Sequence, residues 1–184
     1  SVNNGLVVNE EKYEVYACEA EHSVTAFSYL FKEKEKPGEF YPDKAIALGV
    51  PKGKLWHTLQ CGEEVTIENK TIKPSQVMGP NISGKKIGVS GDTRPTKELE
   101  EFFNACDYLI FDSTFSDELK EKAVESGHST AKEAATLAQN AKVLNLILTH
   151  FSARYNDDKV LLEEAKSIHS SVIAANDQLK IKIS

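Results

Sequence analysis

The sequence predicts a layered α/β fold. From residue 85 onward, short apolar segments alternate with segments of helical pattern, which is typical of strands joined by helices. The chain has 184 residues, of which 40% are hydrophobic, so it can bury the core of one ordinary domain. It contains no long apolar run, and we therefore expect no membrane-spanning segment.

Two strands are expected near the N-terminus. Residues 13–19 (YEVYACE) and 24–31 (VTAFSYLF) are rich in β-branched and aromatic side chains, and residues 21–23 form a short corner between them. Residues 32–56 contain three prolines and three glycines, a composition that favours a protruding arm over a core element. Within this arm only residues 43–48 predict a helix.

The remaining elements follow in a regular order. Two small strands, 63–67 and 71–77, are expected around a turn at 68–70. A capping box formed by Thr130 and Glu133 is expected to start one of the later helices. The alternating part predicts, in chain order, strand 86–90, helix 96–105, strand 107–112, helices 116–126 and 130–141, strand 145–148, helix 157–170, and strands 171–175 and 179–183.

Charge and cysteine content limit the classes of function. A net charge of −6 argues against a nucleic-acid partner, since phosphate binding favours a basic surface. A local basic patch can override that charge, and residues 31–57 hold six Lys against four acidic residues. Cys18, Cys61 and Cys106 are odd in number and widely spaced, which excludes a CxxC zinc site and indicates reduced, cytosolic thiols.

Polar side chains fall at the ends of predicted strands. His22, Asp92 and His150 each follow a strand, and Asp112 ends one. In α/β folds, sites gather beyond the carboxyl ends of strands, and imidazole nitrogens and carboxylate oxygens are normal zinc ligands. The pattern therefore predicts part of a zinc site at this edge of the sheet.

Each of these residues also has an ordinary structural interpretation. A His after a strand is commonly a turn residue, and Asp92 fits the start of a turn or helix. His128 fits an exposed linker between two helices, with Gly127 as the helix stop. His57 and His169 show no functional pattern.

Four segments together resemble ribonuclease Z, a family with the metallo-β-lactamase fold. They are residues 21–29 (EHSVTAFSY), 90–95 (SGDTRP), 127–130 (GHST) and 148–155 (LTHFSARY). The resemblance implies the C-terminal part of a four-layered αββα sandwich with a protruding exosite arm. It implies three regions: 1–31 as the end of an N-terminal half, 32–57 as the exosite arm, and 58–184 as the C-terminal α/β half.

The resemblance also implies roles for single residues. His22 would bind a first zinc, Asp92 would bridge two zincs, and His150 would bind the second. His128 would act at the scissile phosphate, oriented by Asp112, which stands where the family has the Glu of a His-Glu-Ala-Thr motif. Ser152 and Arg154 would contact substrate phosphate, and Lys52 and Lys54 would contact tRNA from the arm.

The implied activity is that of a zinc-dependent endoribonuclease, with two zincs per site, which removes the 3′ trailer from precursor tRNA and leaves a 3′-hydroxyl. A homodimer in the cytoplasm, with no membrane contact, is expected by resemblance. The family's His-x-His-x-Asp-His motif does not occur here. We therefore expect a missing N-terminal half of the same enzyme and no activity from this chain alone.

Two alternatives stay open. One is another phosphodiesterase of the same fold that acts on small phosphodiesters, which would have no need of a basic arm. The other is a non-catalytic tRNA-binding or assembly subunit, which would have no need of the site residues that are present.

Overall fold

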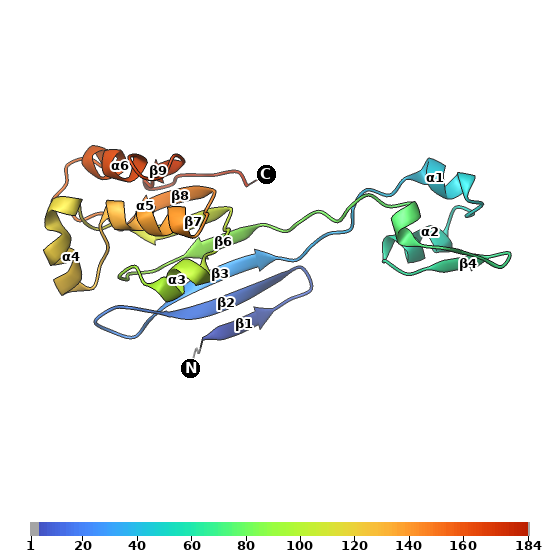
Figure 1. The fold of residues 1–184 in the computed structure, drawn as a ribbon, viewed down its shortest axis with the longest axis horizontal. Helices are drawn as coiled ribbons and strands as arrows, with labels where there is room; N and C mark the ends of the chain where they lie inside the picture. Colours follow the sequence, from blue (N-terminus) through green and yellow to red (C-terminus); the bar gives the residue numbers. More distant parts are fainter. Residues whose placement is uncertain (1–3, 184) are drawn as a thin grey trace. The chain divides into compact units, whose positions relative to one another are not determined.

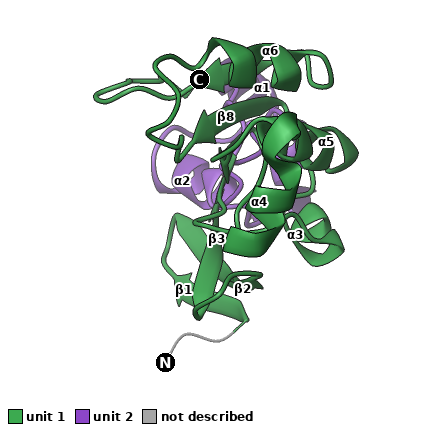
Figure 2. Ribbon diagram, turned by 90° about the vertical axis from the view of Figure 1, so that its left-hand side faces the viewer, with its two compact units in different colours: residues 1–33, 85–184 green, residues 34–84 purple. Residues whose placement is uncertain are grey.

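A computed structural model describes residues 4–183 of the chain. These residues form two compact units, shown in different colours in Figure 2: unit 1 is Ser1–Glu33 with Lys85–Ser184, and unit 2 is Lys34–Gly84. In the part of the chain that is described, no helix is long and apolar enough to cross a membrane.

Unit 1 is built on a seven-stranded sheet in which the strands follow one another in chain order (Figure 1). The first four strands pair antiparallel, and the last four, which share β6 with them, pair parallel. The strands are β1 (Gly5–Asn9), β2 (Tyr13–Ala20), β3 (Ala26–Glu33), β6 (Lys86–Val89), β7 (Tyr108–Asp112), β8 (Asn145–Thr149) and β9 (Val172–Ala174).

Helices connect the parallel strands, as the alternating sequence predicts. They are α3 (Lys97–Phe102), the short 3₁₀ turn η2 (Asp117–Leu119), α4 (Lys120–Ser126), α5 (Ala131–Asn140) and α6 (Lys159–Lys166). The predicted capping box starts α5: the Thr130 hydroxyl accepts from the Glu133 N–H, and the Glu133 carboxylate accepts from the Thr130 N–H.

One face of the sheet and the helices enclose the core of unit 1. Strands β7 and β8 contribute alternate side chains, among them Leu109, Phe111 and Leu148, and all three are fully buried. Helix α5 presents a row of buried alanines to this face, so its backbone can lie close to the sheet. α3 adds Leu99 to the same core.

The opposite face of the sheet carries an apolar groove of about 430 Å³. Ile87, Ile110 and Ile147 line it together with Leu179 and Ile181 from the end of the chain. The predicted strand 179–183 is therefore wrong. The chain turns at residues 177–178, where Gln178 has φ +68°, and then passes over the sheet face instead of along its edge.

Unit 2 has a core of its own, around Ala45, Leu59, Val65, Ile72 and Val77. Its elements are α1 (Pro42–Ala47), α2 (Lys54–Gln60), β4 (Val65–Ile67), β5 (Lys70–Ile72) and the 3₁₀ turn η1 (Pro74–Gln76). The arm expected from the sequence ended at residue 57, whereas this compact unit extends to Gly84 because its core takes side chains from both parts.

Hydrogen-bonded pairs join the two ends of unit 2 in the manner of a hairpin stem. Lys36 and Ile82 exchange two backbone hydrogen bonds of 3.0 and 2.9 Å. One step further, the Glu33 N–H donates to the Lys85 carbonyl at 2.8 Å, where β3 pairs with β6. The insertion thus leaves and rejoins the sheet at neighbouring strands.

The close approach of α3 to the sheet requires the glycine in β6. A Cβ atom on Gly88 would lie 2.5 Å from Cδ1 of Phe103 and 2.9 Å from Cδ1 of Leu109. All three side-chain positions are in the buried core, so no flexible surface group can give way.

We expect Gly88→Ala to lower the free energy of unfolding by about 1–3 kcal/mol, the usual cost of overpacking a core. Urea unfolding followed by circular dichroism measures this change. A second substitution, Phe103→Leu, should recover part of the loss, and Val89→Ala, at a half-exposed neighbouring position, serves as the control. An unchanged midpoint for Gly88→Ala would contradict the packing argument.

Candidate metal centre

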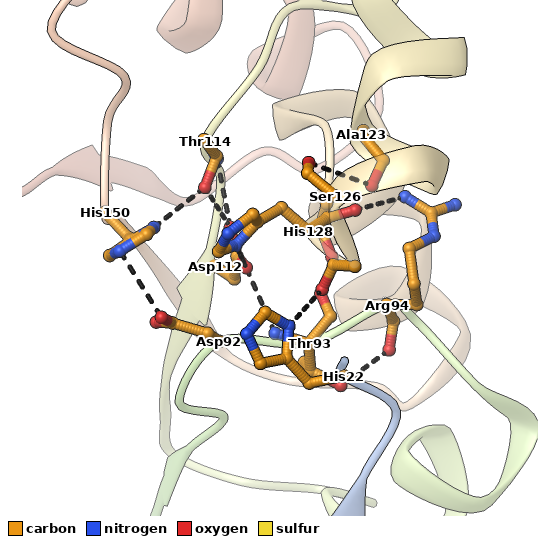
Figure 3. Close-up of polar contacts among 12 residues, drawn as sticks. His22, Asp92, Thr93, Arg94, Asp112, Thr114, Ala123, Ser126, His128 and His150 are labelled. Atoms are coloured by element: carbon orange, nitrogen blue, oxygen red, sulfur yellow. Dashed lines mark hydrogen bonds and ion pairs between the residues drawn. The ribbon is translucent and has the colours of Figure 1, made fainter. Parts of the chain in front are cut away.

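The candidate site lies at one edge of the sheet because four strands end there. β6, β7 and β8 are parallel, and Asp92, Asp112 and His150 lie at or just beyond their carboxyl ends. β2 runs parallel to β6, since two antiparallel pairings separate them, so His22 is delivered to the same edge. His128 comes from the loop between α4 and α5 (Figure 3).

Two hydrogen bonds attach the His22 segment to the loop that follows β6. The Arg94 N–H donates to the Glu21 carbonyl at 2.9 Å, and the Thr93 hydroxyl accepts from the Glu21 N–H at 3.1 Å. These contacts set His22 beside the Asp92 loop although 70 residues separate them in sequence.

Of the five residues that the sequence placed at the site, four form one group that could hold a metal ion, and the fifth, His22, lies beside that group. Asp92, Asp112, His128 and His150 each offer a ligand atom within 4.8 Å of those of the others. His150 Nε2 lies 3.5 Å from Asp92 Oδ2, and the His128 and His150 rings stack with centroids 4.9 Å apart. The His22 ring lies 5.1 Å from that of His128. Their chemical roles remain predictions.

Asp112 connects the loops of the site. It is fully buried, and its Oδ1 accepts from the Thr114 N–H at 3.1 Å and from the Thr114 hydroxyl at 2.6 Å. Its Oδ2 accepts from the Thr93 N–H at 3.1 Å and from His128 Nδ1 at 2.8 Å. Four donors satisfy both oxygens, which offsets the cost of burying the carboxylate.

The contacts of His22 and His128 fix which ring nitrogen carries the proton. The Gly127 carbonyl can only accept, so His22 Nδ1, at 3.0 Å, must donate to it. His128 Nδ1 donates in the same way to Asp112. Both rings therefore have their Nδ1 atoms engaged and keep Nε2 for a metal ion or substrate.

Gly127 is required at its position for two reasons. Its φ is +74°, the left-handed value that ends α4, and a Cβ there would lie 2.7 Å from His22 Nδ1. The glycine therefore both stops the helix and leaves room for the His22 ring.

A partly buried ion pair supports the His128 loop from behind. The Arg94 guanidinium makes a two-pronged contact with the Glu133 carboxylate and also donates to the His128 carbonyl. Both side chains are only 13% exposed. Burial by itself raises the pKa of Glu133, but hydrogen bonds from Arg94 and the Thr130 N–H, with the charges of Arg94 and Lys120, outweigh burial and leave the pKa below its ordinary value.

His150 is held in an uncommon backbone conformation. Its φ is +62°, in the left-handed region that His adopts more often than most residues. Strained backbone of this kind concentrates at functional sites. The Ser152 N–H donates to the Thr114 carbonyl at 3.1 Å and so ties the residues after His150 to the loop after β7.

The predicted substrate residues lie in different units. Arg154 is exposed; its Nε donates to the Ser152 hydroxyl at 2.9 Å, and its guanidinium lies over the Phe115 ring at 4.9 Å. Because the Phe115 ring is 6.4 Å from the His128 ring, Arg154 belongs to the surroundings of the site. Lys52 and Lys54 are exposed in unit 2.

The other histidines and the cysteines have structural surroundings. His169 is buried, and its Nε2 donates to the Val143 carbonyl at 2.9 Å. His57, on α2, has its Nε2 3.6 Å from the sulfur of Cys61, the residue that follows this helix. All three cysteines are free thiols.

Sequence reasoning passed over Thr93, Arg94, Gly127 and Thr114 as parts of the site. Three of them stand inside the quoted segments 90–95 and 127–130, and Thr114 is the last residue of segment 111–114 (FDST), which stands where the family has its His-Glu-Ala-Thr motif. Their position next to the predicted ligands in the sequence could have indicated that they belong to the site. Their hydrogen bonds could not be predicted, because the fold brings their partners to them.

Comparisons with known proteins identify the family. The profile of the family described as "Beta-lactamase superfamily domain" matches residues 20–151. A protein named ribonuclease Z from Nitrosopumilus maritimus is 58% identical over 183 residues, which cover 100% of this chain and 61% of that protein. The ribonuclease Z of Methanosarcina acetivorans is 44% identical over 97% of this chain and 59% of its own length.

Solved structures show the same fold. The short form of human tRNase Z superposes with a TM-score of 0.58 at 22% identity, over 97% of this chain and 46% of that one. A metallo-β-lactamase fold protein from Bacillus subtilis gives a TM-score of 0.58 at 16% identity, over 91% of this chain and 48% of its own. These results confirm the predicted fold class and the resemblance to ribonuclease Z.

The chain spans about three-fifths of the length of the curated relatives that it matches. Those matches extend over the whole of this chain and do not support the expectation of a missing N-terminal half of the same enzyme.

The Arg94–Glu133 pair makes stability depend on pH in the acid range. Because the pKa of Glu133 is lowered on folding, its carboxylate stabilises the fold above the ordinary Glu value of about 4.3, and this contribution is lost as the pH falls through the lower folded value. Glu133→Gln should therefore be less stable than wild type near neutral pH and lose less stability on acidification.

Urea unfolding across this pH range compares the two proteins. Glu125→Gln, at an exposed position on α4, is the matched control and should follow wild type. Parallel pH profiles for wild type and Glu133→Gln would refute a stabilising role of the ion pair.

Proposed function

Because this chain belongs to the β-lactamase superfamily, we propose that it acts in a zinc-dependent endoribonuclease that removes the 3′ trailer from precursor tRNA and leaves a 3′-hydroxyl on the tRNA. The convergence of Asp92, Asp112, His128 and His150 at one sheet edge is the observation that carries this proposal. Relatives named ribonuclease Z support the choice of reaction.

His22, Asp92 and His150 would hold the metal ions. Their donor atoms are imidazole nitrogens and a carboxylate, which suit zinc, and His22 keeps its Nε2 as a lone-pair donor. A bound pair of zinc ions supplies hydroxide at neutral pH and stabilises in-line attack on phosphorus.

The number of these ligands limits what the chain does alone. With Asp92 shared, each zinc would have two protein ligands from this set, whereas tight sites have three or four. The other ligands would come from the His-x-His-x-Asp-His motif of the ribonuclease Z family. That motif does not occur in this sequence. We expect weak zinc binding and no RNA cleavage by Ser1–Ser184 by itself; tight binding would contradict this count.

The remaining site residues would act on the phosphate and the leaving group. Asp112 orients His128, so that a proton on His128 Nε2 would be directed at the scissile phosphate or the leaving oxygen. Ser152 and Arg154 would bind a neighbouring phosphate, to which the Arg guanidinium can make two parallel hydrogen bonds.

Unit 2 would bind the tRNA away from the chemical step. It is a folded insertion with its own core and exposed Lys52 and Lys54, which favours a large polyanionic substrate over a small phosphodiester. A non-catalytic tRNA-binding or assembly role is disfavoured by the retention of the site residues at one edge. Assembly as a homodimer and a cytoplasmic location belong to the same proposal.

The proposal predicts the behaviour of His128→Ala in a polypeptide that carries this chain and extends to the full length of its curated relatives. Turnover of precursor tRNA should fall by roughly 10²–10⁴, the range for loss of a general acid or base. Zinc content, measured by atomic absorption, should be unchanged. His57→Ala in unit 2 is the control, and loss of a zinc from His128→Ala would show that His128 is a ligand.

The proposed role of unit 2 predicts an effect on tRNA binding that is separate from the effect on cleavage. Lys52→Ala combined with Lys54→Ala should weaken the binding of precursor tRNA and reduce its salt dependence by about one unit of slope for each phosphate that the arm no longer neutralises. Filter binding at several salt concentrations measures both quantities. Cleavage of a small phosphodiester should not change, and an equal fall in that activity would refute a role confined to tRNA binding.

A further inference from the structure

We propose that Thr114 is a positioning residue for His150: its hydroxyl holds the imidazole in the tautomer that carries a proton on Nδ1 and a lone pair on Nε2. The contact that carries the proposal is the 2.8 Å separation between Thr114 Oγ1 and His150 Nδ1. The inference deepens the proposed function, since it rests on a metal-binding role for His150.

The Thr114 hydroxyl has two neighbours that compete for its single proton. Its Oγ1 lies 2.6 Å from Asp112 Oδ1 and 2.8 Å from His150 Nδ1, and the side chain is nearly buried (Figure 3). A hydroxyl donates one hydrogen bond and accepts up to two. The direction of one contact therefore decides the direction of the other.

The Asp112 contact decides that direction. The N–H groups of Thr93 and Thr114 can only donate, and they point at different oxygens of Asp112, so both oxygens act as acceptors. The distance of 2.6 Å is that of a hydroxyl donating to a carboxylate. Thr114 thus donates to Asp112, and His150 Nδ1 must donate to Thr114.

This arrangement directs the His150 lone pair into the site. With Nδ1 protonated, Nε2 carries the lone pair that can bind a metal ion. This atom lies 3.5 Å from Asp92 Oδ2. The His150 side chain is 46% exposed, so solvent alone would leave both tautomers available. The stacked His128 ring, 4.9 Å away, limits rotation of the His150 ring.

Thr114 differs from the groups that hold the other two histidines. The Gly127 carbonyl beside His22 and the ionised Asp112 carboxylate beside His128 are acceptors by their chemistry. The Thr114 hydroxyl is an acceptor only because Asp112 takes its proton. The buried carboxylate of Asp112 thereby determines the tautomer of two imidazoles, that of His128 directly and that of His150 through Thr114.

Long-range ¹H–¹⁵N NMR of the metal-free chain, at a pH where imidazole is neutral, reads the tautomer without any metal or RNA. The His150 resonance is assigned by its loss in His150→Gln. We expect the Nδ1–H form in wild type and in Thr114→Ser, which keeps the hydroxyl. Thr114→Val, which removes the hydroxyl at similar volume, should shift His150 toward the Nε2–H form, while His22 should not change.

Titration with Zn²⁺ alone, followed on the same His150 resonance, gives the second measurement, because it detects weak as well as tight binding. Thr114→Val should weaken zinc binding by about 10–100-fold, the usual effect of removing a partner of a metal-binding His. Thr114→Ser should bind as wild type does, which separates the effect of the hydroxyl from a general loss of packing.

Two results would overturn the inference: an Nε2–H tautomer in wild type, or the same tautomer and zinc affinity in Thr114→Val. Either would leave the proposed ribonuclease activity standing. Conversely, an Nδ1–H tautomer that depends on Thr114, in a full-length protein that does not cleave precursor tRNA, would refute the proposed function and support the positioning role of Thr114.

Discussion

The buried carboxylate of Asp112 is the constraint on which the rest of the site depends. Burying an ionised group is costly unless both oxygens are satisfied, and here donors from three separate loops satisfy them. Movement of the Thr93, Thr114 or His128 segment would leave part of a buried charge without a partner. The mutual placement of these loops is thus enforced by the energetic penalty for separating them.

The sheet makes such an arrangement available because of the directions of its strands. Three parallel strands and β2, which two antiparallel pairings return to the same direction, all end at one edge. The alanine face of α5 and the missing side chain of Gly88 let the helices lie close to the core face of these strands. The packing of the core therefore fixes where the strand ends, with their polar side chains, lie relative to one another.

Much of this could be predicted from the sequence, because it depends on local pattern. The strands around Asp112 and His150 and the Thr130–Glu133 capping box follow from apolar periodicity and short spacings. Strand β1, which is exposed along its whole length, and helix α2 after Gly53 have no such signal and were not predicted. The hydroxyl of Thr114 was not predicted either, since its role arises from two residues, 2 and 36 positions away, that only the fold brings to it.

The hairpin stem at the base of unit 2 has a consequence for how the chain can vary. Because Glu33 and Lys85 are already hydrogen-bonded neighbours, the sheet would keep the same pairing if a tight turn replaced everything between them. The entropy of closing such an insertion changes only slowly with its length. Unit 2 can therefore lengthen, shrink or be exchanged among proteins of this fold while the sheet that holds the candidate site keeps its register, so the insertion and the site are free to evolve separately.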